Sequence, residues 1–176
     1  MANEKKKKSY RKEYLNDFRP DESGKYSYQR KMKTFSGAEK AARNLAGRAG
    51  ASAVFFILAA GVVTGRDIGG TAYVLIPYLV ALGAAGFALY SILSLGRKTE
   101  VREYVAKRAV PRIAGGSSTA LFAAALSAAG GLITIITAPG TELILKICFT
   151  LLMAGTAIDA YFMRKAAREL SKSADL

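Results

Sequence analysis

Two long stretches without a charged residue constrain the fold more than any other feature of this chain. Residues 69–96 and 113–141 contain no Asp, Glu, Lys or Arg over 28 and 29 residues, respectively. A helix rises about 1.5 Å per residue and a bilayer core is about 30 Å thick, so each stretch is long enough for a membrane-spanning helix. Residues 49–65 are also uncharged, and 143–163 carries only Lys146 and Asp159. The sequence therefore predicts four spans, at about 49–65, 71–95, 115–137 and 143–163.

The charges are segregated from these apolar runs. The chain is 51% apolar yet has a net charge of +13, and its first 48 residues hold 14 Lys/Arg against six Asp/Glu. Such segregation is typical of an integral membrane protein with a basic water-facing portion. A soluble helical bundle is the alternative, and the uncharged runs of membrane length argue against it.

Turn residues divide the four predicted spans into two pairs. The sequences "GRDIGG" at 65–70 and "APG" at 138–140 break a helix and favour reversal of the chain. We therefore expect an all-α integral membrane protein with four transmembrane helices arranged as two helical hairpins. At an offset of 70, "AAGVVT" (59–64) aligns with "AGGLIT" (129–134). A parallel tandem repeat is one explanation, and a shared bias toward small residues is the other.

The connections between spans predict the orientation of the protein. The N-terminal segment carries 14 Lys/Arg, the connection 97–112 carries six and the tail from Arg164 carries four, whereas the two turns offer only Arg66. Because positive residues resist translocation, we expect both termini in the cytoplasm and the protein in the plasma (cytoplasmic) membrane. The first apolar run begins about fifty residues into the chain, too late for a signal peptide, so it should remain as an anchor.

The water-facing part is expected to comprise four segments: a partly disordered basic arm (1–35) with at most a weak hairpin around Tyr26 and Tyr28, an amphipathic interfacial helix (36–48), a basic loop (97–112) and a tail (164–176). Ser36 and Glu39 have the spacing of a capping box at the start of the second segment. The first span would follow this interfacial helix directly.

Basic residues in these segments predict a lipid or partner surface. Each Lys or Arg near an anionic leaflet contributes about 1 kcal/mol of attraction. The residues assigned to this surface are Lys5, Lys6, Lys7, Lys8, Lys40, Arg43, Arg48, Arg102, Lys107 and Arg108. Anionic membrane lipids are the expected partners, together with a protein partner or a second copy of the chain. Nucleic acid is disfavoured because no recognised nucleic-acid motif is present.

Small residues within the spans predict close helix packing. Without a hydrophobic reward for helix association in lipid, van der Waals contact must supply it, and small side chains allow the backbones to approach. The predicted packing residues are Gly61, Gly65, Gly83, Gly86, Ala123, Ser127, Gly131 and Gly155. Any of these faces is alternatively a homo-oligomer contact. Pro77 lacks a backbone donor and is expected to kink the second span, with gating as the secondary interpretation.

Asp159 and Lys146 are the two charged residues inside the predicted spans. Asp159 precedes Arg164 by five residues, so its Cα lies about 7.5 Å from the basic boundary. At that depth we expect it to reach headgroup water or pair with a cation from 97–112; a proton or cation relay is the alternative. Lys146 lies near the other end of its span, where it either extends toward Glu142 or joins such a relay.

The residue types argue against catalysis. The chain has no His, and no nucleotide-binding glycine pattern occurs. Cys148 has no neighbouring base and is expected to be buried among its apolar neighbours. We therefore predict no enzyme, no catalytic residue, no metal and no cofactor, and a non-catalytic accessory, scaffolding or assembly subunit. The alternative is a small oligomeric transporter or channel for an ion or small solute that uses Asp159 and Lys146, disfavoured because few polar groups occupy the midplane.

Overall fold

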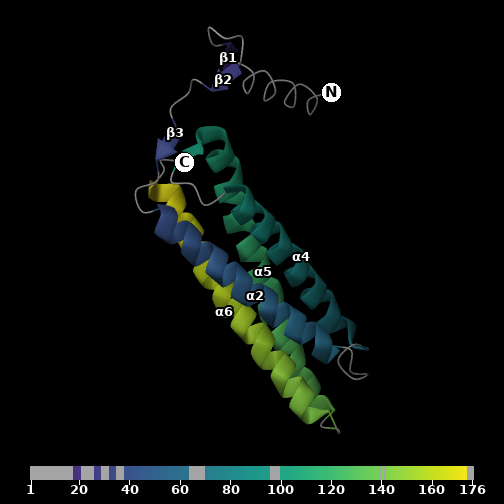
Figure 1. Ribbon diagram of the computed structural model, residues 1–176. Helices are drawn as coiled ribbons and strands as arrows, with labels where there is room; N and C mark the ends of the chain where they lie inside the picture. The colour runs from purple at the N-terminus through teal and green to yellow at the C-terminus, as the bar shows by residue number, and fades with distance from the viewer. Residues whose placement is uncertain are drawn as a thin grey trace, which may run out of the picture.

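Four long helices form the body of the protein in a computed structural model (Figure 1). The structure describes residues 18–20, 26–28, 32–34, 38–63, 70–95, 100–138, 140 and 142–173. Its helices are α2 (Ala38–Val63), α4 (Ala72–Leu95), α5 (Glu103–Thr137) and α6 (Leu143–Ser173). All four are long and apolar enough to cross a membrane. This confirms the predicted number of spans and their helical nature, and it indicates a membrane protein.

Three helices extend beyond their predicted spans. Helix α2 begins at Ala38, so the segment expected as an interfacial helix is continuous with the first span. Helix α5 begins at Glu103 and runs through Pro111, so much of the expected loop is helical. Helix α6 continues past Arg164 to Ser173. These added turns carry Lys and Arg, which favour helix as readily as apolar residues do and project into water.

Four three-residue strands lie outside the helical bundle. Strand β1 (Phe18–Pro20) pairs antiparallel with β2 (Tyr26–Tyr28), at the position of the expected weak hairpin. Strand β3 (Met32–Thr34) pairs antiparallel with β4 (Glu100–Arg102), with Lys33 opposite Val101. The second pair joins the N-terminal segment to the chain just before α5.

Many large apolar side chains of the helices face outward, while small side chains are buried between the helices beside larger ones such as Phe149 and Met153. Ala81, Ala120 and Ala124 are almost completely buried, whereas Ile57, Ile136 and Ile144 are more than 70% exposed. So many exposed large apolar side chains are unusual in a water-soluble bundle and suit a lipid environment, in which close helix contact depends on small residues. Cys148 also faces outward, so the prediction that it is buried was wrong.

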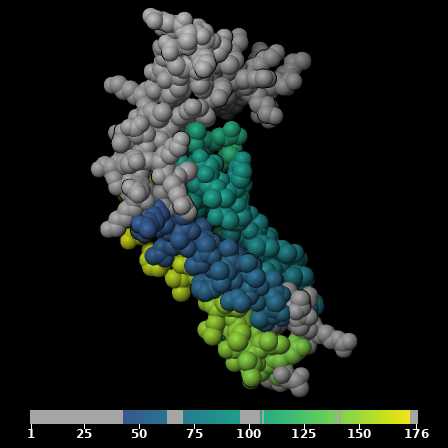
Figure 2. Space-filling view, in the orientation of Figure 1, coloured from purple at the N-terminus to yellow at the C-terminus, as the bar shows by residue number. Residues whose placement is uncertain are grey.

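Each of the four helices contacts two others, and one of the four contacts is weak. Helix α5 contacts α4 and α6 extensively, α2 lies mainly against α6, and contacts between α2 and α4 are sparse. Figure 2 shows α2 lying between α4 and α6 on one face. We call the end with Leu45, Leu95 and Leu170 the basic end, and the end where α4 and α6 begin the turn end.

Glycines mark the closest approaches between helices. A Cβ built on Gly131 of α5 would clash with the Thr150 hydroxyl oxygen of α6, and one on Gly155 of α6 would lie 3.2 Å from Phe55 Cε2 of α2. Because a residue without a side chain is needed at these two positions, α6 packs closely against both α5 and α2.

Candidate functional site

An ion pair joins α2 to α6 near the basic end. Arg48 Nη1 donates a hydrogen bond to Asp159 Oδ1 over 3.3 Å. The Arg48 guanidinium carbon also lies 4.3 Å from the centre of the Phe162 ring, which follows Asp159 by nearly one turn of α6. Carboxylate and aromatic face therefore hold the same cation.

On both helices the next cation toward the basic end lies five residues from the pair. Arg43 precedes Arg48 by five residues on α2, and Arg164 follows Asp159 by five on α6. Five helical residues correspond to about 7.5 Å. The Asp159 side chain is 15% exposed and that of Arg48 is 38% exposed. A charge at this depth is costly alone in lipid, so each member of the pair lowers the cost of the other.

Sequence reasoning placed the partner of Asp159 in 97–112, whereas the structure assigns it to Arg48. The reason is that α2 packs against α6 on the side that carries Asp159 and Gly155. The equal five-residue offsets from Arg43 and Arg164 were a sequence signal for this pairing. They place one cation and one anion at the same depth on two antiparallel helices.

Lys146 is fully buried at the turn end. Its relative exposure is 0%, and its Nζ donates a hydrogen bond of 2.5 Å to the backbone oxygen of Ala138. Ala138 directly follows α5, so the ammonium group meets the negative end of that helix's dipole. The sequence predicts that Lys146 extends toward Glu142. The hydrogen bond with Ala138 instead joins its ammonium group to the end of α5. Glu142 Oε2 is buried and has no hydrogen-bond partner among the described residues.

The two predicted relay residues are not brought together. Asp159 and Lys146 are 13 residues apart on α6, or about 20 Å along its axis. Between them, buried hydroxyl groups donate to backbone oxygens: Thr150 to Lys146, Thr134 to Gly131, Thr156 to Leu152 and Ser127 to Val74. These bonds satisfy interior polar groups rather than leave them directed toward a solute.

The predicted packing residues fall into two groups. Ala123, Ser127 and Gly131 are buried on α5, and a Cβ built on Gly155 would contact Phe55. In contrast, a Cβ built on Gly61, Gly83 or Gly86 would have no atom within 4 Å. The prediction for Gly65 lies outside the described residues.

Pro77 lies in the second turn of α4, where it removes the donor that would bond the Tyr73 oxygen. Helix α5 approaches this irregular turn closely. Ser127 Oγ donates to the Val74 oxygen over 3.1 Å, and a Cβ on Gly130 would lie 3.1 Å from the Tyr73 oxygen. The proline region is therefore supported by α5, and the predicted kink angle stays a prediction.

Cations collect at the basic end of the bundle. The described side chains of this kind are Arg43, Arg48, Lys107, Arg108, Arg112, Arg164, Lys165, Arg168 and Lys172, against the acids Asp159 and Glu169. Arg112 also lies over the Phe87 ring, 5.7 Å from its centre. Lys40 and Arg102 lie in α2 and β4, but their side chains, like Lys5–Lys8 entirely, fall outside the described part. Four residues of the predicted lipid surface, Arg43, Arg48, Lys107 and Arg108, therefore have described side chains, and their contact with lipid stays a prediction.

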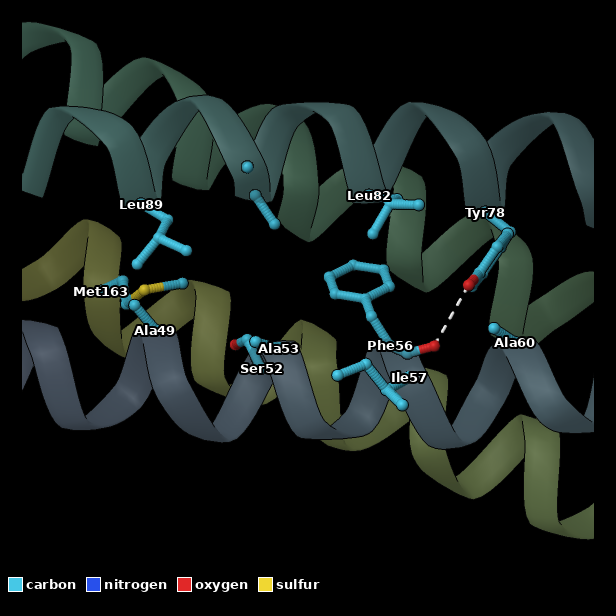
Figure 3. Close-up of a pocket in the computed structure, with 12 residues that line it drawn as sticks. Ala49, Ser52, Ala53, Phe56, Ile57, Ala60, Tyr78, Leu82, Leu89 and Met163 are labelled. Atoms are coloured by element: carbon cyan, nitrogen blue, oxygen red, sulfur yellow. Dashed lines mark hydrogen bonds between the residues drawn. The ribbon is translucent and has the colours of Figure 1, made fainter. Parts of the chain in front are cut away.

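A groove of about 290 Å³ opens between α2 and α4 (Figure 3). It extends from Ala49, Leu89 and Met163, nearest the basic end, to Ala60 and Tyr78. Its full lining is Ala49, Ser52, Ala53, Phe56, Ile57, Ala60, Tyr78, Leu82, Ala85, Gly86, Leu89 and Met163. The Tyr78 hydroxyl donates to the Phe56 oxygen over 3.1 Å. The sequence did not predict this groove, because the distance between two helices depends on how the whole bundle packs.

Ser52 is the other hydroxyl in the groove lining. It is 2% exposed, and its Oγ has no hydrogen-bond partner within the part of the chain that the structure describes. Rotation about χ1 would bring the Ser52 hydroxyl within reach of the backbone oxygen of Arg48, four residues earlier. Ser91 and Thr156 make hydrogen bonds of this kind on their own helices. The groove is therefore an apolar site in which the Tyr78 hydroxyl is hydrogen-bonded and the Ser52 hydroxyl has a backbone oxygen of its own helix within reach.

No protein-family model, characterised protein or solved structure matches this chain. Function must accordingly be argued from these sites. Within the described ranges no three His, Cys, Asp or Glu side chains lie together in a metal-binding group.

Proposed function

We propose that this chain is a non-catalytic multi-pass membrane protein that acts as an accessory, scaffolding or assembly subunit. Its basic end would contact anionic lipid headgroups or a protein partner. One observation supports the proposal: the two charged residues inside the predicted spans, Asp159 and Lys146, make contacts that hold helices together. Asp159 binds Arg48, and Lys146 binds the end of α5. A translocation path instead needs polar groups that face a passage.

The proposed orientation places the basic end and both termini in the cytoplasm of a plasma membrane. The cations at the basic end support this orientation because positive residues resist translocation. The two-hairpin arrangement and the tandem repeat belong to the same proposal. A repeat with an offset of 70 exchanges α2 with α5 and α4 with α6, so it relates the α2–α6 contact to the α4–α5 contact, and both are extensive. The same exchange relates the sparse α2–α4 contact to the extensive α5–α6 contact, so any repeat is not followed by the packing within each pair.

Isolation of the full-length protein in its native lipid tests the proposed role. We expect a stable larger complex, whose components mass spectrometry identifies, and no ion flux when the purified protein is reconstituted in liposomes. Asp159→Asn should weaken assembly without a flux phenotype. The opposite result, intact assembly with an abolished flux, contradicts the accessory role.

A transporter or channel is the second candidate because Lys146 is fully buried within a span. Ionisable residues inside membranes commonly mark ion or substrate pathways. Under this alternative a homo-oligomer passes ions in liposomes, and Lys146→Met abolishes the flux. Under the accessory role the same substitution destabilises the end of α5 and changes no flux.

A further inference from the structure

We propose that the groove between α2 and α4 holds one hydrocarbon chain of an anionic phospholipid from the leaflet at the basic end. This inference rests on the proposed membrane role and adds a specific ligand and site to it. Size, lining and charge each support this occupant.

The size of the groove fits a single chain. Ala49 and Ala60 are eleven residues apart, so the groove runs about 16 Å along α2. A helix segment of that length and about 10 Å diameter fills roughly 1,200 Å³, far more than the 290 Å³ available. The groove volume is instead about twice the ~150 Å³ cavity that accommodates benzene. An extended chain fits inside this volume, whereas a helix would have to lie outside it.

The lining is apolar along the whole groove. Ala53, Ile57, Leu82 and Gly86 come from the two facing helices, and Met163 of α6 lies deeper (Figure 3). Tyr78 is bonded to Phe56, and Ser52 has an oxygen of its own helix within reach. An occupant therefore needs no polar group at this depth, which describes the chain of a lipid rather than its headgroup.

The charge at the open end selects the headgroup. Arg43 and Arg48 precede Ala49 on α2 and, at 3.6 residues per turn, lie on opposite flanks of the stripe that lines the groove. Arg48 is already paired with Asp159, so Arg43 is the cation of this pair that a headgroup would meet. The acids Asp159 and Glu169 are outnumbered among the described side chains at that end. Each cation near a headgroup of net negative charge adds about 1 kcal/mol of attraction, equivalent to about fivefold in affinity. A headgroup with net negative charge is thus favoured over a zwitterionic one.

Two glycines of α4 provide a matched pair of variants. A Cβ on either Gly83 or Gly86 would meet no atom within 4 Å, but only Gly86 lines the groove. Gly86→Leu places a large side chain where the lipid chain would lie, whereas Gly83→Leu adds the same side chain outside the groove. Ala53→Leu fills the groove from α2 and serves if Gly86→Leu does not fold.

The test uses full-length protein in phosphatidylcholine vesicles containing phosphatidylglycerol with a photoreactive group in its acyl chain. Mass spectrometry maps the adducts. We expect adducts concentrated on groove residues in the native protein and in Gly83→Leu. Gly86→Leu should give about tenfold fewer, because overpacking that weakens lipid binding by about 1.4 kcal/mol lowers the affinity about tenfold. Ser52→Ala should leave the yield unchanged. A phosphatidylcholine probe should give about fivefold fewer groove adducts.

Several results overturn the proposal. Adducts spread evenly over outward residues such as Ile136 and Ile144, or equal yields from Gly83→Leu and Gly86→Leu, show that the groove holds no specific chain. Equal yields from the two lipids remove the anionic assignment, and a large loss in Ser52→Ala shows a polar occupant. A second probe with the photoreactive group on its headgroup reports contact with the basic end separately. If it labels the basic end while the groove stays unlabelled, the groove proposal fails and the proposed membrane role survives.

Discussion

The ion pair between Arg48 and Asp159 gives the sharpest quantitative prediction. At the observed N–O distance of 3.3 Å and an effective dielectric constant of about 20, two unit charges attract by about 5 kcal/mol. Desolvation and the 38% exposure of Arg48 offset much of this attraction. We expect each single substitution, Arg48→Gln or Asp159→Asn, to lower the free energy of unfolding by about 2 kcal/mol, because each leaves a charge without its partner below the outer cations.

The double substitution separates this mechanism from loss of packing. If the two side chains act as a pair, Arg48→Gln with Asp159→Asn costs about 2 kcal/mol rather than about 4, since neither charge then remains alone. Equilibrium unfolding in mixed micelles, followed by far-UV circular dichroism, measures all three variants. Arg43→Gln is the matched control on the same helix, expected within about 0.5 kcal/mol of the native protein. Additive losses in the double variant would refute the reasoning.

Three further substitutions test contacts elsewhere in the bundle. Gly131→Ala should destabilise the protein by about 1–3 kcal/mol in the same unfolding assay, because its Cβ meets the Thr150 hydroxyl; Thr150→Ala should restore part of the loss, and Gly83→Ala should cost nothing. Lys146→Met should cost about 1–3 kcal/mol, since the Ala138 oxygen loses its donor, and an unchanged stability would contradict the capping role. Gly61→Leu should preserve the folded monomer in detergent, because no atom lies within 4 Å of its added Cβ; loss of a crosslinked dimer in this variant would mark that face as an oligomer contact.

The number and position of the spans followed from the sequence because membrane insertion depends on local composition. The uncharged run 69–96 contains α4 entirely, and 113–141 contains most of the third span. The ends of the helices were less predictable. At the basic end, the drop in hydropathy predicts that the third span begins near residue 115, whereas α5 already begins at Glu103, in a charged segment. Hydropathy reports where lipid ends, and hydrogen bonding decides where the helix ends.

The side chains within the site were harder to predict than the spans. Cys148 lies among apolar residues. In a water-soluble protein this pattern indicates a buried side chain, but in a protein surrounded by lipid it does not, and Cys148 faces outward. Similarly, Gly61 and Gly131 occupy corresponding positions at an offset of 70, yet only Gly131 is pressed against another helix. A small residue permits close approach, and whether a neighbour takes that position depends on the whole bundle.

The weak contact between α2 and α4 connects these observations to the proposed role. Helix α2 carries Arg43 and Arg48 at the basic end, so whatever fixes α2 also positions these two cations. Since α4 contacts it sparsely, α2 is held mainly by α6, through the Gly155–Phe55 approach and the Arg48–Asp159 pair. A lipid chain in the groove would fill the remaining side of α2. The ion pair and the groove therefore act on the same helix, and both would set how the basic end is presented to a membrane surface or a partner.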